Sequence, residues 1–159
     1  MLVGGDLLQM DVVDQRIIAL LTADARASFA EIGTKVSLSA PAVKRRVDRL
    51  RAKGIIKGFT TIVEPSALGW TTEAFVELFC TGRTTPAQIT VATRRHPEVL
   101  GAYTVSGEAD ALVHLRAADI GHLEQALERL RAEPFVTSTR SMVVLSRLVE
   151  TPSPAPVPN

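Results

Sequence analysis

The 159-residue sequence predicts an α+β protein in which an N-terminal three-helix helix-turn-helix domain is joined to a C-terminal βαββαβ ferredoxin-like domain. Two observations support this prediction. Three apolar patterns of helical spacing occupy the first third of the chain, and start signals precede the second and the third. A strand–helix–strand pattern then occurs twice, and its matching residues are 37 positions apart.

Apolar spacing predicts the first helix, and a capping box marks the start of the second. From Asp11, apolar residues recur at helical spacing to about residue 22. Ser28 and Glu31 then form a capping box, in which each side chain can satisfy a free backbone N–H at the helix start. The second helix is therefore expected to run from there to about Val36.

The stretch SAPAVKRRVDRL predicts the third helix. Ser39 is a good N-cap, and Pro41 falls in the first turn, where its missing N–H costs nothing. On a helical wheel, Val43, Val47 and Leu50 share one side, and the basic residues point away from it or flank it. We expect the apolar side to pack on the first two helices.

Charge is concentrated around this third helix. The net charge of +1 conceals a segment from Lys35 to Lys57 in which eight basic residues are accompanied only by Asp48. A helix that follows a tight turn and is apolar beneath and basic above is typical of a recognition helix in the major groove. The alternative is a solvated charged face. Double-stranded DNA is the predicted partner.

Individual roles can be assigned on this helix. We expect Arg45 and Arg49 to lie toward the groove, and the helix start to approach the bases through Ser39, Ala40 and Pro41. The residues expected to meet mainly phosphates are Lys44, Arg46 and Arg51.

A break separates the helical part from the repeat. After Gly54, which predicts a helix stop, an alternating run predicts a strand that leads out of the first domain, and Pro65 and Gly69 end it. The last nine residues contain four prolines and predict a disordered tail. The expected boundaries are 1–54 for the helix-turn-helix domain, 55–70 for a linker strand and hinge, 71–150 for the βαββαβ domain and 151–159 for the tail.

The repeat predicts the architecture of the second domain. Two βαβ copies in series give a βαββαβ order, in which an antiparallel sheet carries both helices on one face. The run EAFVELF is apolar on both sides, so both faces of its strand need burial; a second subunit, or a helix from elsewhere in the chain, could cover the free face. The matching residues are Ala74, Val76, Leu78, Pro97 and Val99 in the first copy and Ala111, Val113, Leu115, Pro134 and Val136 in the second.

This order of elements resembles the Lrp/AsnC ("feast/famine") family of bacterial and archaeal transcription regulators, over roughly residues 11–148. The resemblance is carried by the helical stretch DVVDQRIIALLTADARASFAEIGTKVSLSAPAVKRRVDRLRAKGIIKGFTTIVEPSALG and by PEVLGAYTVSGEADALVHL, which is similar to the family's ligand-binding domain with its Gly-x-x-Asp turn, here Gly107 to Asp110. It implies a sequence-specific DNA-binding regulator that responds to an amino acid or related metabolite. It also implies a homodimer that assembles further into a tetramer or octamer, with the effector bound between dimers.

The effector is expected at the turn VSGEAD, where the two copies of the repeat meet. Gly107 can adopt a positive φ and lets backbone N–H groups approach a ligand carboxylate, while Asp110 could hold the turn or accept from the ligand's ammonium group. An ordinary hairpin turn is the alternative. The candidate effector residues are Tyr103, Thr104, Ser106, Gly107, Glu108, Ala109, Asp110, Thr139 and Ser141.

Enzymatic and membrane functions find little support in the sequence. His96, His114 and His122 lack metal-ligand spacing, and the scattered glycines form no phosphate-binding loop, so we expect no catalysis, metal or cofactor. The single cysteine and the lack of a signal or spanning segment predict a cytoplasmic protein with no membrane partner. Two alternatives stay open: a chromatin-organising protein that binds DNA broadly, and a ligand-sensing regulatory subunit that does not bind DNA.

Overall fold

The computed structural model describes residues 10–149, so the predicted tail at 151–159 lies outside the described residues. The chain divides into two units, and the division falls between Ile62 and Val63. This point lies inside the linker predicted at 55–70. Each unit is described separately below.

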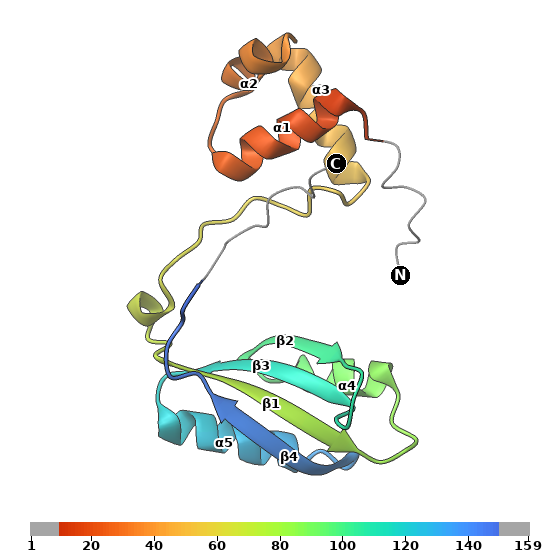
Figure 1. Cartoon of the computed structure of the whole chain (residues 1–159), viewed down its shortest axis with the longest axis vertical. Helices are drawn as coiled ribbons and strands as arrows, with labels where there is room; N and C mark the ends of the chain where they lie inside the picture. Colours follow the sequence, from red (N-terminus) through yellow and green to blue (C-terminus); the bar gives the residue numbers. More distant parts are fainter. Residues whose placement is uncertain (1–9, 150–159) are drawn as a thin grey trace. The chain divides into compact units, whose positions relative to one another are not determined.

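The N-terminal unit contains the three predicted helices (Figure 1). The Asp11 side chain accepts from the N–H of Asp14, Ser28 and Glu31 form both bonds of the capping box, and the Ser39 hydroxyl accepts from Ala42 N–H. The predicted helix starts are therefore confirmed. The helices are α1 (Val12–Ala23), α2 (Phe29–Val36) and α3 (Ala40–Ala52), and their shared core contains Ile17, Leu21, Ile32, Val36, Val43 and Val47.

A very tight turn joins α2 to α3. Ser37 adopts a left-handed conformation with a φ of 58°, and the N–H of Leu38 donates to the carbonyl of Gly33 at 2.9 Å. A Cβ on Gly33 would lie 2.4 Å from the Leu38 carbonyl oxygen, so only glycine permits this close approach. The turn thereby fixes α3 against α2, as a helix-turn-helix requires.

The linker strand predicted after Gly54 is not formed in the structure. Residues 57–64 have no regular secondary structure and are followed by the short 3-10 helix η2 (Pro65–Leu68). An extended segment becomes a strand only when a neighbouring strand pairs with its backbone groups. Phe59, Ile62 and Val63 of this segment are exposed, and none of the described strands pairs with it.

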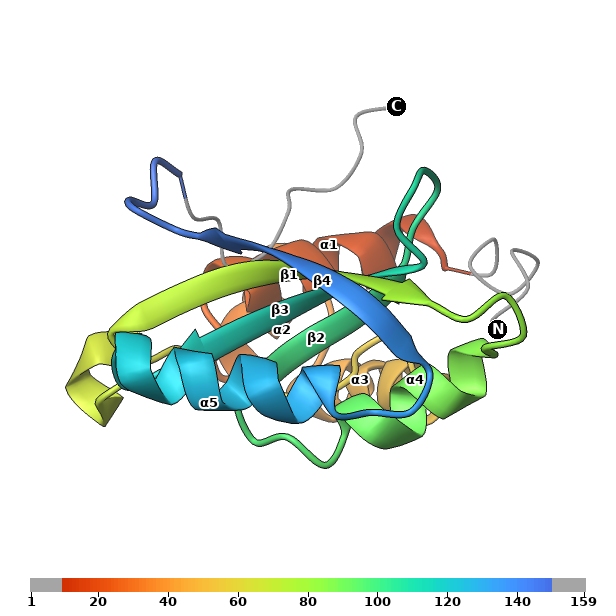
Figure 2. The same cartoon turned by 90° about the horizontal axis from the view of Figure 1, so that it is seen from below.

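The C-terminal unit confirms the predicted βαββαβ order. Its four strands form one sheet in the order β2-β3-β1-β4, with antiparallel neighbours throughout, and helices α4 and α5 lie on the same face (Figure 2). The elements are β1 (Thr72–Cys80), α4 (Pro86–Thr93), β2 (Val99–Thr104), β3 (Ala111–Ala117), α5 (Ile120–Arg131) and β4 (Val136–Val143).

The two copies of the repeat meet along the centre of the sheet. Val76 of β1 lies opposite Val113 of β3, which is its own repeat counterpart. The matched residues of β1 and β3 face the helices and are buried with side chains such as Leu123 and Leu130 of α5. The remaining matched pairs are crossed: Ala74 lies opposite Leu115, and Leu78 lies opposite Ala111.

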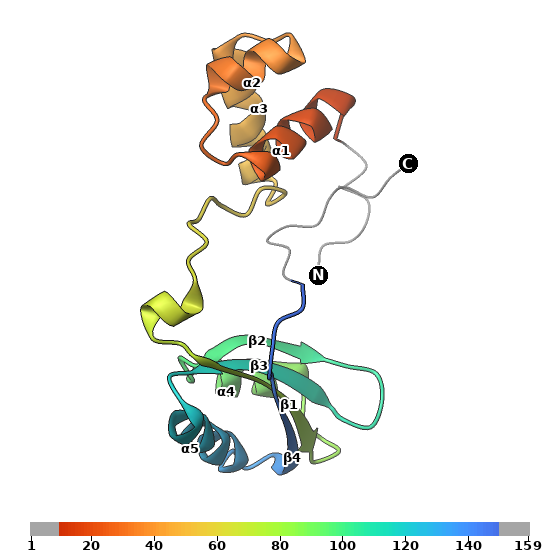
Figure 3. The ribbon, with the colours of Figure 1, turned by 60° about the vertical axis from the view of Figure 1, so that its left-hand side comes forward.

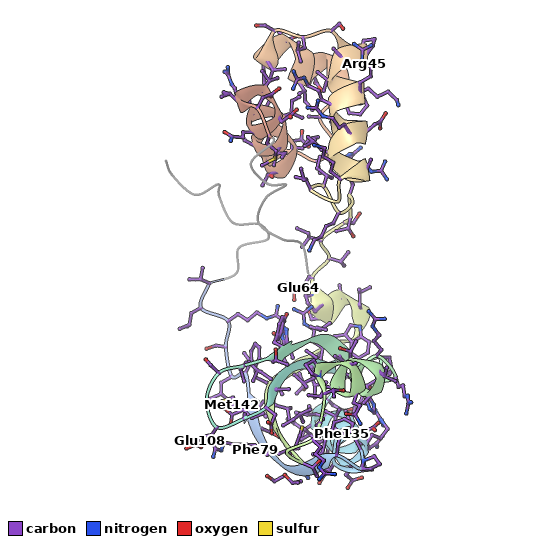
Figure 4. The ribbon with its side chains drawn as sticks, turned by 90° about the vertical axis from the view of Figure 1, so that its right-hand side faces the viewer. Arg45, Glu64, Phe79, Glu108, Phe135 and Met142 are labelled. Atoms are coloured by element: carbon purple, nitrogen blue, oxygen red, sulfur yellow. The ribbon has the colours of Figure 1, made fainter. Side chains whose placement is uncertain are left out.

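The opposite face of the sheet also carries apolar side chains. The ring of Phe75 stacks on His114, with centroids 4.5 Å apart and planes 10° apart, and Arg140 lies over the ring of Phe79. Met142, opposite Phe75 in the register, is 46% exposed (Figure 4). No helix of the described C-terminal unit packs on this surface, which we call the open face.

Candidate DNA-binding surface and effector turn

Helix α3 presents the two sides that the wheel predicted. Val43, Val47 and Leu50 are buried, whereas Arg45 projects outward from the helix (Figure 4). Among the described residues, Arg45 has no ion-pair partner. Its guanidinium is therefore available to a ligand outside the chain.

Two other arginines of α3 contact α1 instead. Arg49 Nη2 lies 2.6 Å from Asp14 Oδ2, and Arg46 Nη1 lies 2.8 Å from Asp14 Oδ1 and 2.5 Å from Asp11 Oδ2. The Asp14 side chain is only 1% exposed, and a buried carboxylate requires such charged partners. In this structure both guanidinium groups are bound within the domain, and the expected contacts of Arg49 with the groove and of Arg46 with phosphates stay predictions.

The ion pair between Arg46 and Asp11 favours the charged form of both side chains. A bond from Arg46 is the main reason that the pKa of Asp11 is lowered, and bonds to Asp11 and Asp14 raise the pKa of Arg46.

The sequence-based prediction did not identify Asp14 as a functional residue. A signal was present, since Asp14 is three and seven residues before Ile17 and Leu21 and so shares their buried side of α1.

The rest of the predicted DNA-binding set lies on the accessible part of α3. Lys44 Nζ lies 2.6 Å from Asp48 Oδ2, one helical turn further on, and both side chains are largely exposed. Ser39 and Pro41 are exposed at the helix start, where Ala40 is half-buried, and Arg51 is exposed in the last turn.

The turn between β2 and β3 has the backbone predicted for it. It extends beyond the end of the sheet (Figure 3), and Gly107 has a φ of 134°. Asp110 Oδ2 accepts from the N–H of Cys80 at 2.7 Å, and the N–H of Asp110 donates to the carbonyl of Leu78 at 3.0 Å. Asp110 therefore anchors the turn on the end of β1, one of the two roles expected of it.

The walls predicted for the effector site do not lie together in one chain. Tyr103 and Thr104 are on β2, whereas Thr139 and Ser141 are on β4, at the opposite edge of the sheet. Within one chain, β3 and β1 lie between β2 and β4. At about 4.8 Å per strand, the separation is roughly 14 Å.

Two contacts of β4 lie near the turn. Thr139 Oγ1 accepts a hydrogen bond from Arg131 Nε at 2.9 Å on the helix side, and Arg140 Nη2 lies 3.9 Å from Glu108 Oε2. Ser106 and Glu108 are exposed, whereas Ala109 is buried. The turn is thus fixed in position and open to a ligand, but a single chain surrounds it incompletely.

Residues 10–149 contain neither a metal-binding cluster nor a membrane-spanning helix. No group of three or more His, Cys, Asp or Glu residues could hold a metal ion. No helix in this range is both long enough and apolar enough to cross a bilayer.

The fold and the basic surface of α3 define a two-domain helix-turn-helix protein of the transcription-regulator type. The model of the AsnC-type helix-turn-helix domain matches residues 10–51, and the model of the Lrp/AsnC ligand binding domain matches residues 73–154. The chain belongs to the Lrp/AsnC family of transcriptional regulators, as its sequence resemblance indicated.

Relatives of known sequence and structure agree with this assignment. The chain is 56% identical to the HTH-type transcriptional regulator Rv2324 of Mycobacterium tuberculosis, with 89% of this chain and 96% of the relative covered. It is 34% identical to the proline dehydrogenase transcriptional activator of Rhodobacter capsulatus, over 92% of this chain and 97% of that one. Among solved structures, the feast or famine regulatory protein Rv3291c of M. tuberculosis, complexed with L-methionine, matches with a TM-score of 0.84 at 31% identity. That match covers 92% of this chain and 99% of the other.

Proposed function

We propose that this regulator binds double-stranded DNA sequence-specifically as a homo-oligomer in the cytoplasm, and that an amino acid or related small metabolite modulates the binding. The observation that carries the proposal is α3, whose buried side fixes it in the helix-turn-helix while its outer side presents Arg45, which has no ion-pair partner within residues 10–149. The role is regulatory rather than enzymatic, in line with the relatives, which are a transcriptional regulator and a transcriptional activator.

DNA recognition is assigned to the exposed part of α3. Arg45 projects toward base edges, where an arginine can bind guanine O6 and N7 with two parallel bonds. The helix start at Ser39, Ala40 and Pro41 approaches the bases, and Lys44 and Arg51 meet phosphates. Arg46 and Arg49 support the helix through Asp14, and Arg49, which is 49% exposed, can add a phosphate contact.

The effector site is assigned to the turn at 105–110. The positive φ of Gly107 exposes backbone N–H groups to a ligand carboxylate, and the bond from Cys80 N–H keeps the Asp110 side chain at the base of the turn. Because Tyr103 and Thr104 lie at the opposite edge from Thr139 and Ser141, a second chain must complete the site. The L-methionine complex of the 31% identical mycobacterial regulator supports an amino acid as the ligand.

Oligomerisation is assigned to the open face. Phe75, Phe79 and Met142 place apolar surface there, and a second copy would bury it. A dimer also brings two recognition helices to paired half-sites about one helical turn apart. Further assembly to a tetramer or octamer would place the turns of neighbouring dimers together.

Footprinting on the DNA around the regulator's own gene, with and without each of the twenty amino acids, tests this function directly. We expect protection of paired half-sites and a change in their affinity with at least one amino acid. Equal affinity for unrelated duplexes would instead indicate a broadly binding chromatin protein. Absence of salt-dependent DNA binding would indicate a ligand-sensing subunit that uses the basic helix for protein contacts.

A further inference from the structure

An acidic side chain lies on the surface of α3 that faces away from the core. At about 100° per residue, Asp48 is roughly 60° from Arg45 around the helix, and Pro41 is roughly 40° from it on the same side. Val43 and Val47 are on the opposite side and are buried. Asp48 is exposed beside Arg45, and it is the only acid between Lys35 and Lys57.

The contacts of Asp48 contribute too little to the stability of the fold to explain why an acid occupies this position. Within residues 10–149 its ion-pair partner is Lys44, with Nζ 2.6 Å from Asp48 Oδ2, and the side chains of Lys44 and Asp48 are 61% and 50% exposed. A pair this exposed contributes little to folding, because water screens the attraction and both flexible side chains lose freedom. The carboxylate can therefore exchange Lys44 for another donor with little loss.

The chemistry of DNA limits what that donor can be. Phosphates repel a carboxylate, so on a surface that approaches the duplex an Asp48 side chain that has released Lys44 needs a donor on a base edge. In the major groove the amino groups of cytosine and adenine are the donors, and Asp or Glu characteristically accepts from cytosine N4. Arg46 and Arg49 contact Asp14, which leaves Arg45 and Asp48 as neighbouring charged groups on the outward side of α3.

We propose that Asp48 is a specificity-determining residue that accepts a hydrogen bond from a cytosine N4 amino group in the major groove and releases Lys44 to a phosphate. The inference rests on the proposed sequence-specific DNA binding and goes beyond it by assigning a base. On DNA that lacks the cytosine, Lys44 stays paired with Asp48. The specific complex accordingly gains one more phosphate contact than the non-specific complex.

The test uses the full-length protein and duplexes selected by the wild type from a randomised pool. Binding is titrated to each single-base variant of the selected site with wild type, Asp48→Ala and Asp48→Asn. Asp24→Asn is the control, since it removes an exposed acid from the same domain but lies beyond the end of α1. Thermal unfolding verifies that every variant is folded.

If Asp48 reads a cytosine, three linked results are expected, two on base preference and one on the salt dependence of binding. Asp48→Ala loses preference at one base pair by about 5- to 150-fold and leaves the other positions unchanged. Asp48→Asn changes the preference at that pair from cytosine to adenine, because asparagine pairs with adenine N6 and N7. For the wild type, the salt slope is about one unit steeper on the selected site than on unrelated DNA, and Asp48→Ala removes this difference.

Two results would overturn the inference, and they can be told apart. If both Asp48 variants strengthen binding to every duplex by the same factor, as a general charge effect would, Asp48 reads no base while the proposed function stands. If the wild type selects no sequence from the pool, sequence-specific binding itself fails, and the role of Asp48 fails with it.

Discussion

The buried carboxylate of Asp14 on α1 lies 2.6 Å from the guanidinium of Arg49 on α3, so an ion pair connects the first helix directly to the helix that carries the DNA-binding surface. Arg46 contacts the second oxygen of the same carboxylate. Both oxygens of Asp14 are thereby used within the domain. The contact fixes the rotation of α3 about its own axis, which decides whether Arg45 faces outward.

Replacing Asp14 with asparagine should weaken this connection. We expect Asp14→Asn to lower the free energy of unfolding of the helix-turn-helix unit by about 1–3 kcal/mol, because two charged bonds in a buried position become weaker. DNA affinity should fall for all sequences together, since α3 loses its fixed orientation. Calorimetric unfolding and gel-shift titration measure the two effects, and Asp24→Asn should change neither by a comparable amount. An unchanged unfolding temperature for Asp14→Asn would contradict this role.

Arg45, Lys44 and Arg49 should respond differently to alanine. Arg45→Ala should reduce discrimination between the selected site and its variants by about 1–3 kcal/mol, because a base-reading bond is lost. Lys44→Ala should lower the affinity for the selected site, where Lys44 meets a phosphate, and flatten the salt slope there by about one unit. Arg49→Ala should reduce stability as well, since it leaves Asp14 with fewer partners. Titrations at several salt concentrations separate the three, and equal, negligible binding losses for Arg45→Ala and Lys44→Ala would refute the assignment.

The turn at 105–110 makes a prediction about ligand binding. Gly107→Thr should abolish binding of the effective amino acid, because a β-branched residue cannot adopt a φ of 134° without strain. Asp110→Ala should weaken binding by releasing the turn from Cys80. Calorimetry with the twenty amino acids measures this, and Gly82→Ala, in an open loop without positive φ, serves as the control. If both turn variants stay folded and oligomeric and bind as tightly as wild type, the effector site lies elsewhere.

The ionisation of Glu73 should make the stability of the C-terminal unit depend on pH. Burial alone would raise the pKa of Glu73, but bonds from His114, Arg147 and Arg116 outweigh it and lower the pKa below its usual value of about 4.3. A lowered folded pKa means that the stabilisation is present above pH 4.3 and is lost as the pH falls through the folded pKa. Glu73→Gln should therefore be less stable than wild type near pH 7, with a smaller decrease in unfolding temperature on acidification. Exposed Glu124→Gln should retain the wild-type pH profile, and an equally steep decrease for Glu73→Gln would argue against the linkage.

The open face predicts where the chains associate. A fragment of residues 65–150 should form a dimer at micromolar concentration, because it contains the open face, whereas residues 1–64 should stay monomeric. Light scattering on both fragments measures their masses. A monomeric C-terminal fragment that retains the circular dichroism spectrum of a folded domain would count against this interface.

Most of the fold could be predicted because local signals and tertiary structure agree. The caps at Asp11, Ser28 and Ser39 start helices where their hydroxyl or carboxylate oxygens can accept free N–H groups, and these bonds need no distant residue. The βαββαβ order could be derived because the 37-residue repeat constrains both halves at once. The linker strand failed for the converse reason: its alternation gives a propensity, but pairing needs a partner that residues 10–149 do not supply.

The candidate sites were predicted less completely, because charges find partners that sequence distance conceals. Arg49 pairs with Asp14 across 35 residues of chain, so the wheel could give its direction but not its partner. Thr139 and Tyr103 were grouped by family topology, yet the order of strands in one chain puts them on opposite edges. Gly107 was anticipated because a positive φ is a local property that residue type alone restricts.

The crossed pairing of the repeat has a consequence for how the sheet finds its alignment. Ala74 faces Leu115 and Leu78 faces Ala111, so each large side chain meets a small one and the two strands interlock. A slip of two residues would keep the buried side chains on the same face, but it would oppose Ala74 with Ala117 and crowd Leu78 against Val113. One end would then hold a void and the other a clash. When a duplicated segment pairs with its own copy in this way, the alternation of large and small side chains disfavours this two-residue shift in register.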